Sequence, residues 1–173
     1  MEESNKEKSG IEKAGEDLFN FALDREDLKS IISLLPKEAD IKRETVEYEL
    51  QILKFIGTGW SITFFLENST YKNQLAELYW KAVYQYSQSI SEATDLMIGH
   101  KIDYFQVLKD RLEMYIEAMR QQPGAPEPAV IIGPEFARTC GNVDDIFAVM
   151  AGSRMFKLTV ASIKEYFEKI QML

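Results

Sequence analysis

Four acidic residues have the types and the spacing of a divalent-cation site. Glu44 and Glu47 stand three positions apart, and Glu92 and Asp95 repeat that spacing further along the chain. Residues three positions apart share one face of a helix. Oxygen ligands of this kind bind hard cations such as Mg²⁺ together with the phosphate groups of a substrate. If the two helices pair antiparallel, we expect the four carboxylates to support Mg²⁺-dependent hydrolysis of a phosphorylated small molecule.

This arrangement resembles that of the all-α nucleotide pyrophosphohydrolases, which use paired acidic residues on neighbouring helices. The resemblance covers only Glu44, Glu47, Glu92 and Asp95, and the doubled glutamate on the first helix of that family is missing here. It implies a Mg²⁺-dependent hydrolase as one alternative. The other alternative is a set of solvated carboxylates on two helix faces, because the chain has 28 acidic residues.

The counts of histidine and cysteine exclude several other chemistries. The chain has one histidine, His100, and one cysteine, Cys140. A ferritin-like di-metal centre needs two histidines, and a thiolate zinc site needs several cysteines, so both are excluded. We interpret His100 as a loop residue that follows a helix end, and Cys140 as a small buried hydrophobic residue rather than as part of a Cys–His dyad.

Two aromatic residues indicate a binding surface. Trp80 and Tyr84 stand four positions apart, on a helix face that is otherwise polar. Tryptophan and tyrosine contribute much of the binding energy at protein interfaces. We therefore expect either an interaction surface at these two residues or their burial within the monomer, under the C-terminal helix or residues 123–134.

Helical periodicity extends along almost the whole chain, and no segment alternates in the manner of a strand. The predicted helices cover residues 16–35, 38–67, 71–98, 104–122 and 153–171, with short helices beginning at Pro134 and after Asn142. Residues 123–134 contain four prolines and two glycines, a composition that predicts a packed loop. Whether this loop has a function stays open.

The second predicted helix is expected to be the core of the fold. Its second half is apolar on nearly all sides, which is typical of a buried helix. It contains Gly57 and Gly59, which we expect to permit the close approach of a neighbouring helix, with a kink as the alternative.

These patterns predict an all-α fold. We expect a helical bundle of five to six main helices around a central antiparallel helical hairpin, formed by residues 38–98. Residues 1–15 are charged and lack apolar periodicity, so we expect a mobile N-terminal arm. Residues 16–173 are expected to form a single all-α domain, in agreement with the length of the chain.

Composition limits the classes of partner. The formal net charge is −8, from 20 basic and 28 acidic residues, which argues against binding to nucleic acid or to an anionic membrane. The most apolar run, residues 50–66, contains Gln51 and Lys54 and is predicted to be a buried core helix rather than a membrane span. The N-terminal residues lack the apolar region of a secretory signal, so we expect a cytoplasmic protein.

We expect this chain to act by binding rather than by catalysis, without a cofactor. The leading hypothesis is a homo-oligomer, an adaptor or an assembly chaperone that contacts a protein partner through Trp80 and Tyr84. The Mg²⁺-dependent hydrolase is one alternative. Another is a carrier of an apolar ligand or cofactor, bound between the second and third predicted helices, with His100 as the one histidine that could bind haem iron.

Overall fold

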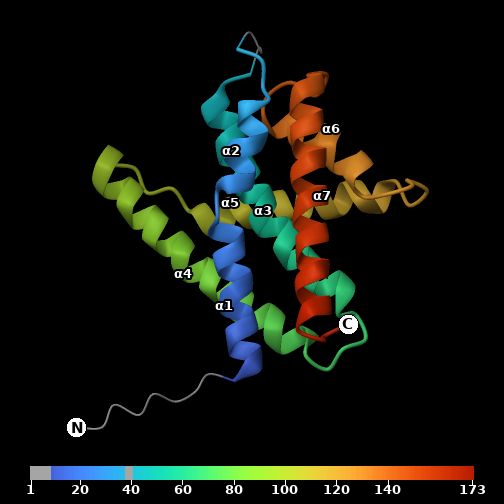
Figure 1. Cartoon of the computed structure of the whole chain (residues 1–173). Helices are drawn as coiled ribbons and strands as arrows, with labels where there is room; N and C mark the ends of the chain where they lie inside the picture. The colour runs from blue at the N-terminus through green and yellow to red at the C-terminus, as the bar shows by residue number, and fades with distance from the viewer. Residues whose placement is uncertain (1–8, 38–40) are drawn as a thin grey trace.

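The computed structural model describes residues 9–37 and 41–173, and this part of the chain forms seven α-helices and no strands. The five long helices are α1 (Gly10–Leu23), α3 (Arg43–Phe65), α4 (Lys72–Ile98), α5 (Tyr104–Gln121) and α7 (Ile146–Lys169) (Figure 1). The two shorter helices are α2 (Glu26–Ser33) and α6 (Ala129–Thr139). The prediction of an all-α bundle is therefore confirmed.

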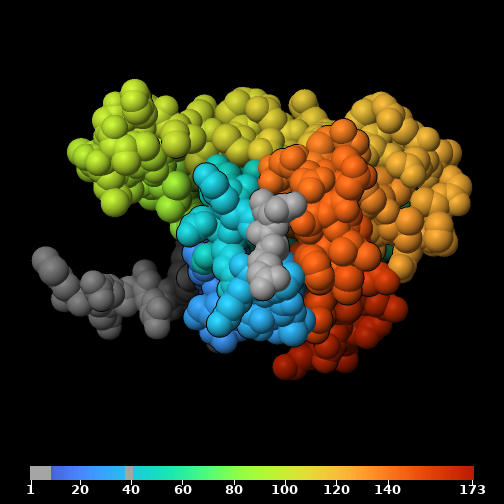
Figure 2. Space-filling model, turned by 90° about the horizontal axis from the view of Figure 1, so that it is seen from above, coloured from blue at the N-terminus to red at the C-terminus, as the bar shows by residue number. Residues whose placement is uncertain are grey.

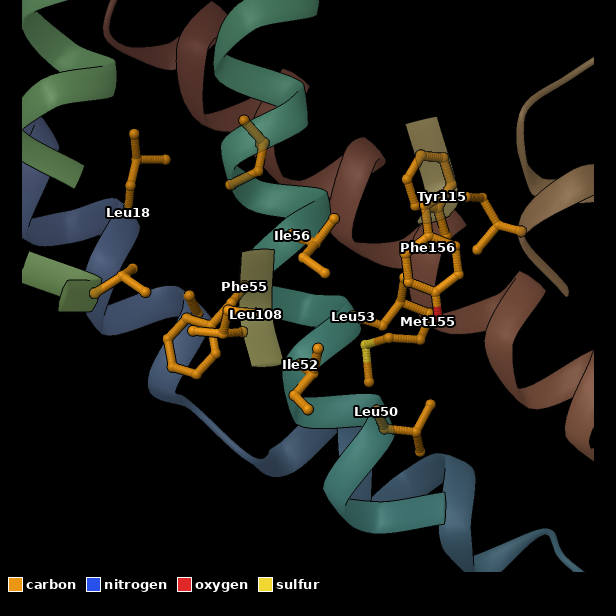
Figure 3. Close-up of a cluster of buried hydrophobic side chains, with 14 of the residues drawn as sticks. Leu18, Leu50, Ile52, Leu53, Phe55, Ile56, Leu108, Tyr115, Met155 and Phe156 are labelled. Carbon is orange, nitrogen blue, oxygen red and sulfur yellow. The ribbon is translucent and has the colours of Figure 1, made fainter. Parts of the chain in front are cut away.

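Helix α3 lies at the centre of the bundle. Helices α1, α2, α4, α5 and α7 all pack against it. Figure 3 shows its apolar side chains among Leu18 of α1, Leu108 of α5 and Phe156 of α7. Residues 50–62 of this helix are all buried except Trp60, which is half-buried. The second half of this helix is buried over most of its length, as its apolar composition predicts.

Helix α4 runs in the opposite direction to α3 and diverges from it (Figure 1). Near its start it packs on α1 and α3, where the Tyr79 hydroxyl donates a hydrogen bond to the Phe55 carbonyl at 2.7 Å. Its far end lies away from the bundle. Gly99 ends the helix with a φ of 70°, at the position predicted from the sequence.

A capping box places the start of α1 earlier than predicted. The Ser9 hydroxyl accepts a hydrogen bond from the Glu12 amide, and the Glu12 carboxylate accepts one from the Ser9 amide. The helix therefore begins at Gly10, within the segment of residues 1–15 for which we expected a mobile arm. Residues 1–8 lie outside the described part of the chain.

The predicted helix over residues 16–35 is two helices in the structure. Asp24 has extended backbone angles and ends α1, and its carboxylate accepts a hydrogen bond from the Glu26 amide at the start of α2. The prediction of one continuous helix is wrong because the backbone is extended at Asp24, where the carbonyl accepts a hydrogen bond from the buried Lys54 ammonium of α3. The next helix, predicted from residue 38, begins at Arg43, and residues 38–40 lie outside the described residues.

Residues 123–134 are a loop only in their first half. Helix α6 begins at Ala129, directly after Pro128, and contains Pro134 in its interior rather than at its start. Proline is favoured at the beginning of a helix, and Ile131 and Ile132 are buried there, so the segment gains burial by becoming helical. The predicted boundary at Pro134 is wrong for this reason.

The last two predicted helices are one helix, α7. The Asp145 carboxylate caps it by accepting a hydrogen bond from the Ala148 amide at 2.9 Å. Ser153, where the last helix was predicted to start, lies inside α7. Its hydroxyl donates a hydrogen bond to the Ala129 carbonyl of α6. Gly152 lies directly against the Phe136 side chain, so α6 and α7 approach closely there.

The two glycines of α3 confirm the prediction of close approach. A Cβ atom at Gly59 would overlap the indole ring of Trp80 on α4. A Cβ atom at Gly57 would lie 3.1 Å from the Thr159 Cγ2 atom of α7. Helices α4 and α7 thus reach α3 at positions where it has no side chain.

We expect Gly59→Ala to destabilise the protein by about 1–3 kcal/mol, because the Trp80 ring must move out of a packed core. This loss exceeds the gain of about 1 kcal/mol that alanine brings to a helix interior. Chemical denaturation monitored by circular dichroism would measure it. Gly10→Ala, where nothing lies within 4 Å of the added atom, is the matched control and should leave stability unchanged or slightly raised. Equal stabilities of the two variants would contradict this packing.

Candidate functional site

The four acidic residues of the predicted cation site are not brought together. Glu44, Glu92 and Asp95 are exposed, and Glu47 is half-buried in an ion pair with Arg25. Within residues 9–37 and 41–173, no group of three or more histidine, cysteine, aspartate or glutamate side chains could hold a metal ion. The spacing puts each pair on one helix face but does not assemble the pairs into one site.

Trp80 and Tyr84 differ in their environments. Trp80 is half-buried, with its ring over Gly59 and beside a hollow of about 250 Å³ along α5. Tyr84 is 47% exposed and makes an edge-to-face contact with Phe105, with ring centroids 5.1 Å apart. The cover over Trp80 thus comes from α3 and α5, neither of which was among the segments that we expected to provide it.

The region between α3 and α4, where an apolar ligand was one alternative, contains packed aromatic side chains. Tyr79 and Phe55 are fully buried there, and the ring centroids of Phe55 and Tyr86 lie 5.7 Å apart. His100, which could have bound haem iron, is exposed beyond the end of α4.

The buried charges of α3 are satisfied within the fold. The Lys54 ammonium donates to the Asp24 carbonyl at 2.7 Å and lies 3.3 Å from an Asp27 carboxylate oxygen. The Glu49 carboxylate accepts two hydrogen bonds from the Arg111 guanidinium, at 3.0 and 2.8 Å. These pairs tie neighbouring elements to α3, so we assign them a structural role.

An apolar groove lies between α2 and α7, which lie side by side in Figure 1. We call it the α2–α7 groove. Its volume is about 480 Å³, and its apolar lining comprises Ile31, Leu34, Leu35, Phe147, Met150 and Leu158, among others. Leu34 and Met150 are each 61% exposed. The end of α2 and helix α7 therefore both contribute exposed apolar side chains to this groove.

This groove was missed by the sequence reasoning because α7 was predicted in two pieces. Phe147, Met150, Arg154 and Leu158 recur at steps of three and four residues, which places them on one helix face. The predicted break at Ser153 separated the first two from the last two. A continuous periodicity across residues 146–158 was the signal that could have found the face.

Basic side chains border the α2–α7 groove. Arg154 is exposed, lines the groove, and makes no ion pair with any described residue. Lys157 also lines it and lies 2.6 Å from a Glu127 carboxylate oxygen. The Arg43 guanidinium donates to the carbonyl of Leu35, a lining residue. In a chain with a net charge of −8, this edge is locally basic.

A second apolar surface lies at the far end of α4, which we call the α4 tip and define as Leu96, Met97, Ile98 and the following Ile102. Leu96 is 88% exposed and Met97 is 83% exposed. Figure 2 shows this end of helix α4 at the edge of the molecule, away from α7. Single exposed hydrophobic residues are ordinary, but a contiguous group of them indicates an interaction site.

Helix α7 also has the length and composition of a membrane span. Only 39% of its most apolar stretch is buried, and its exposed remainder includes the wall of the α2–α7 groove. One such helix is weak evidence for a membrane protein, since core helices of soluble proteins meet the same criteria. The run at residues 50–66, by contrast, lies in the centre of the bundle, as predicted for a core helix.

Comparisons of this chain with protein-family models, with curated proteins and with solved structures found no match.

Burial raises the pKa of the Cys140 thiol to about 12, with a further increase from the Glu49 and Asp145 carboxylates. We expect slow alkylation by iodoacetamide at pH 8, because the thiolate is the reactive form. The rate should increase toward pH 12 and should be at least tenfold higher at pH 8 in denaturant, where the thiol pKa returns to about 8.5. Mass spectrometry would measure both rates.

The same shift has a consequence for stability. Between the unfolded pKa of about 8.5 and the folded pKa of about 12, only the unfolded chain has released the Cys140 proton, so the contribution of this group to stability is lost across that range as pH rises. Equal alkylation rates with and without denaturant at pH 8 would contradict the burial of this thiol.

Proposed function

We propose that this protein works by binding, as an adaptor or as a subunit of an assembly, and that its α2–α7 groove receives an amphipathic helix with acidic residues. The observation that carries the proposal is the convergence of exposed apolar side chains from two elements on one groove. Leu34 comes from the end of α2, and Phe147 and Met150 come from the first turns of α7.

A helix suits this groove better than a small polar substrate does. Of the described residues that line the groove, only Ser153 has a hydroxyl, and it already donates to the Ala129 carbonyl. The lining by described residues includes no carboxylate, imidazole or thiol. An apolar groove between helices is a common receptor for the apolar face of a partner helix. Covering each exposed side chain here would contribute about 1.5–3 kcal/mol if its burial were complete.

The charges at the groove favour an acidic partner. Arg154 is exposed without an ion pair to a described residue, Arg43 bonds to the carbonyl of the lining residue Leu35, and Lys157 lines the groove in an ion pair with Glu127. Complementary charge at the rim of an interface increases the rate of association and selects the partner. An acidic helix therefore satisfies both the apolar lining and the basic edge.

We expect a fluorescein-labelled peptide helix of leucine, alanine and glutamate to bind the full chain, as measured by fluorescence anisotropy. A peptide with lysine in place of each glutamate should bind at least tenfold more weakly, a difference of about 1.4 kcal/mol. Met150→Asp should weaken binding of the acidic peptide at least tenfold, because it places a carboxylate in the apolar lining. Arg154→Gln should reduce the dependence of binding on salt.

Tyr84→Ala is the matched control, since Tyr84 is also an exposed apolar side chain but lies on α4, apart from the groove lining. It should leave binding unchanged. Loss of binding in Tyr84→Ala with full binding in Met150→Asp would contradict the proposal. It would indicate that the peptide binds at the Trp80–Tyr84 surface instead.

A further inference from the structure

We infer that the occupant of the α2–α7 groove is the α4 tip of a second copy of this chain. This inference rests on the proposed function, because it names the partner of the same groove. The chain would then self-assemble through two different surfaces, the α4 tip of one copy and the α2–α7 groove of the other. Both surfaces are present on every copy, so no other protein is needed to complete the contact.

The α4 tip and the turn before it combine apolar and acidic side chains, the two kinds of group that the groove is proposed to bind. Leu96, Met97 and Ile98 supply consecutive exposed apolar side chains, of which the first two are almost fully solvated. Glu92 and Asp95 are exposed on the preceding turn of the same helix. In a helix, Glu92 and Leu96 are four positions apart and share a face, so acidic and apolar groups are presented together.

The charges of the two surfaces are complementary. The acids at the tip are exposed and make no ion pair with any described residue, and the same is true of Arg154 in the groove. Lys101 is exposed directly before Ile102 of the tip, beyond Gly99 and the helical turn that carries the two acids. The apolar side chains would enter the groove while Glu92 and Asp95 approach its basic edge.

The tip and the groove cannot meet within one molecule. In Figure 1 the end of α4 lies well apart from the paired α2 and α7, and in Figure 2 it lies at the edge of the molecule away from α7. A contact between the two surfaces therefore requires two copies. A two-fold axis would form the same contact twice, tip to groove and groove to tip, and would close a dimer.

Two double variants and their mixture test this contact. The tip variant carries Leu96→Asp and Met97→Asp, and the groove variant carries Leu34→Asp and Met150→Asp; all four side chains are more than half exposed, so both variants should fold. Sedimentation velocity of the full chain should show concentration-dependent self-association of the unmodified protein. Each variant alone should associate at least tenfold more weakly.

The mixture of the two variants is the decisive sample. The tip variant retains an intact groove and the groove variant retains an intact tip, so an equimolar mixture should form a heterodimer with one of the two contacts. Its affinity should lie between those of the unmodified protein and of either variant alone. Val130→Asp, at an exposed apolar residue outside both surfaces, is the control and should associate like the unmodified protein. Circular dichroism verifies that each variant is helical.

Several outcomes would overturn the inference. An unmodified protein that stays monomeric at every concentration excludes the contact. A mixture that associates no better than either variant alone points to tip–tip or groove–groove pairing instead. Binding of the acidic leucine–alanine–glutamate peptide to the groove, without self-association, would leave the proposed function standing and would reject only this choice of partner. Failure of both experiments would reject both.

Discussion

The fold depends on the burial of α3, a helix that carries polar side chains into the core of the protein. Glu49, Gln51, Lys54, Thr58 and Ser61 are all buried, and each has a hydrogen-bond partner. Leaving such a group without a partner costs about 1–3 kcal/mol, and more for a charged group. Thr58 and Ser61 donate to carbonyls of α3 itself, whereas the partners of Glu49, Gln51 and Lys54 come from other elements, which are therefore held at fixed places against α3.

Two of these residues determine the position of α1 and α2. The Gln51 amide donates to the Ala22 carbonyl at 2.7 Å, and the Lys54 ammonium donates to the Asp24 carbonyl. Both carbonyls belong to the end of α1, where the chain turns into α2. The turn thus satisfies the buried groups of α3, and it places the short helix α2 beside α7.

The α2–α7 groove follows from this arrangement. Helix α6 packs closely against α7 through Gly133 and Gly152, and α3 packs against another side of α7 at Gly57. Helix α2 has only eight residues, so it covers little of the remaining face. Met150 and its neighbours on that face stay exposed because no described element is long enough to cover them.

The sequence predicts those features that depend on local chemistry. The predicted helix end at residue 98 and the predicted helix start at residue 104 are both found, since Gly99 ends α4 and the Asp103 carboxylate caps α5 by accepting from the Gln106 amide. The capping box at Ser9 was equally local and was overlooked. The apolar composition around Gly57 likewise indicates a buried helix without any knowledge of its neighbours.

Features that depend on distant contacts were not predictable in this way. The break at Asp24 is held by Lys54, 30 positions away in the sequence. Gly152 lowers the local preference for helix, yet α7 continues through it because Phe136 occupies the space above it. Similarly, the spacing of Glu92 and Asp95 places both on one helix face, but it contains no information on the distance from that face to the helix that carries Glu44 and Glu47.

The most direct test of this account is the methyl NMR spectrum of the full chain, followed on dilution from a concentrated solution. If the groove is covered by the tip of a second copy, the methyl signals of Leu34 and Met150 will shift together with those of Leu96 and Met97, along one common binding curve. If the signals of Leu34 and Met150 do not change at any concentration, nor on addition of the acidic peptide, the α2–α7 groove is not the binding surface.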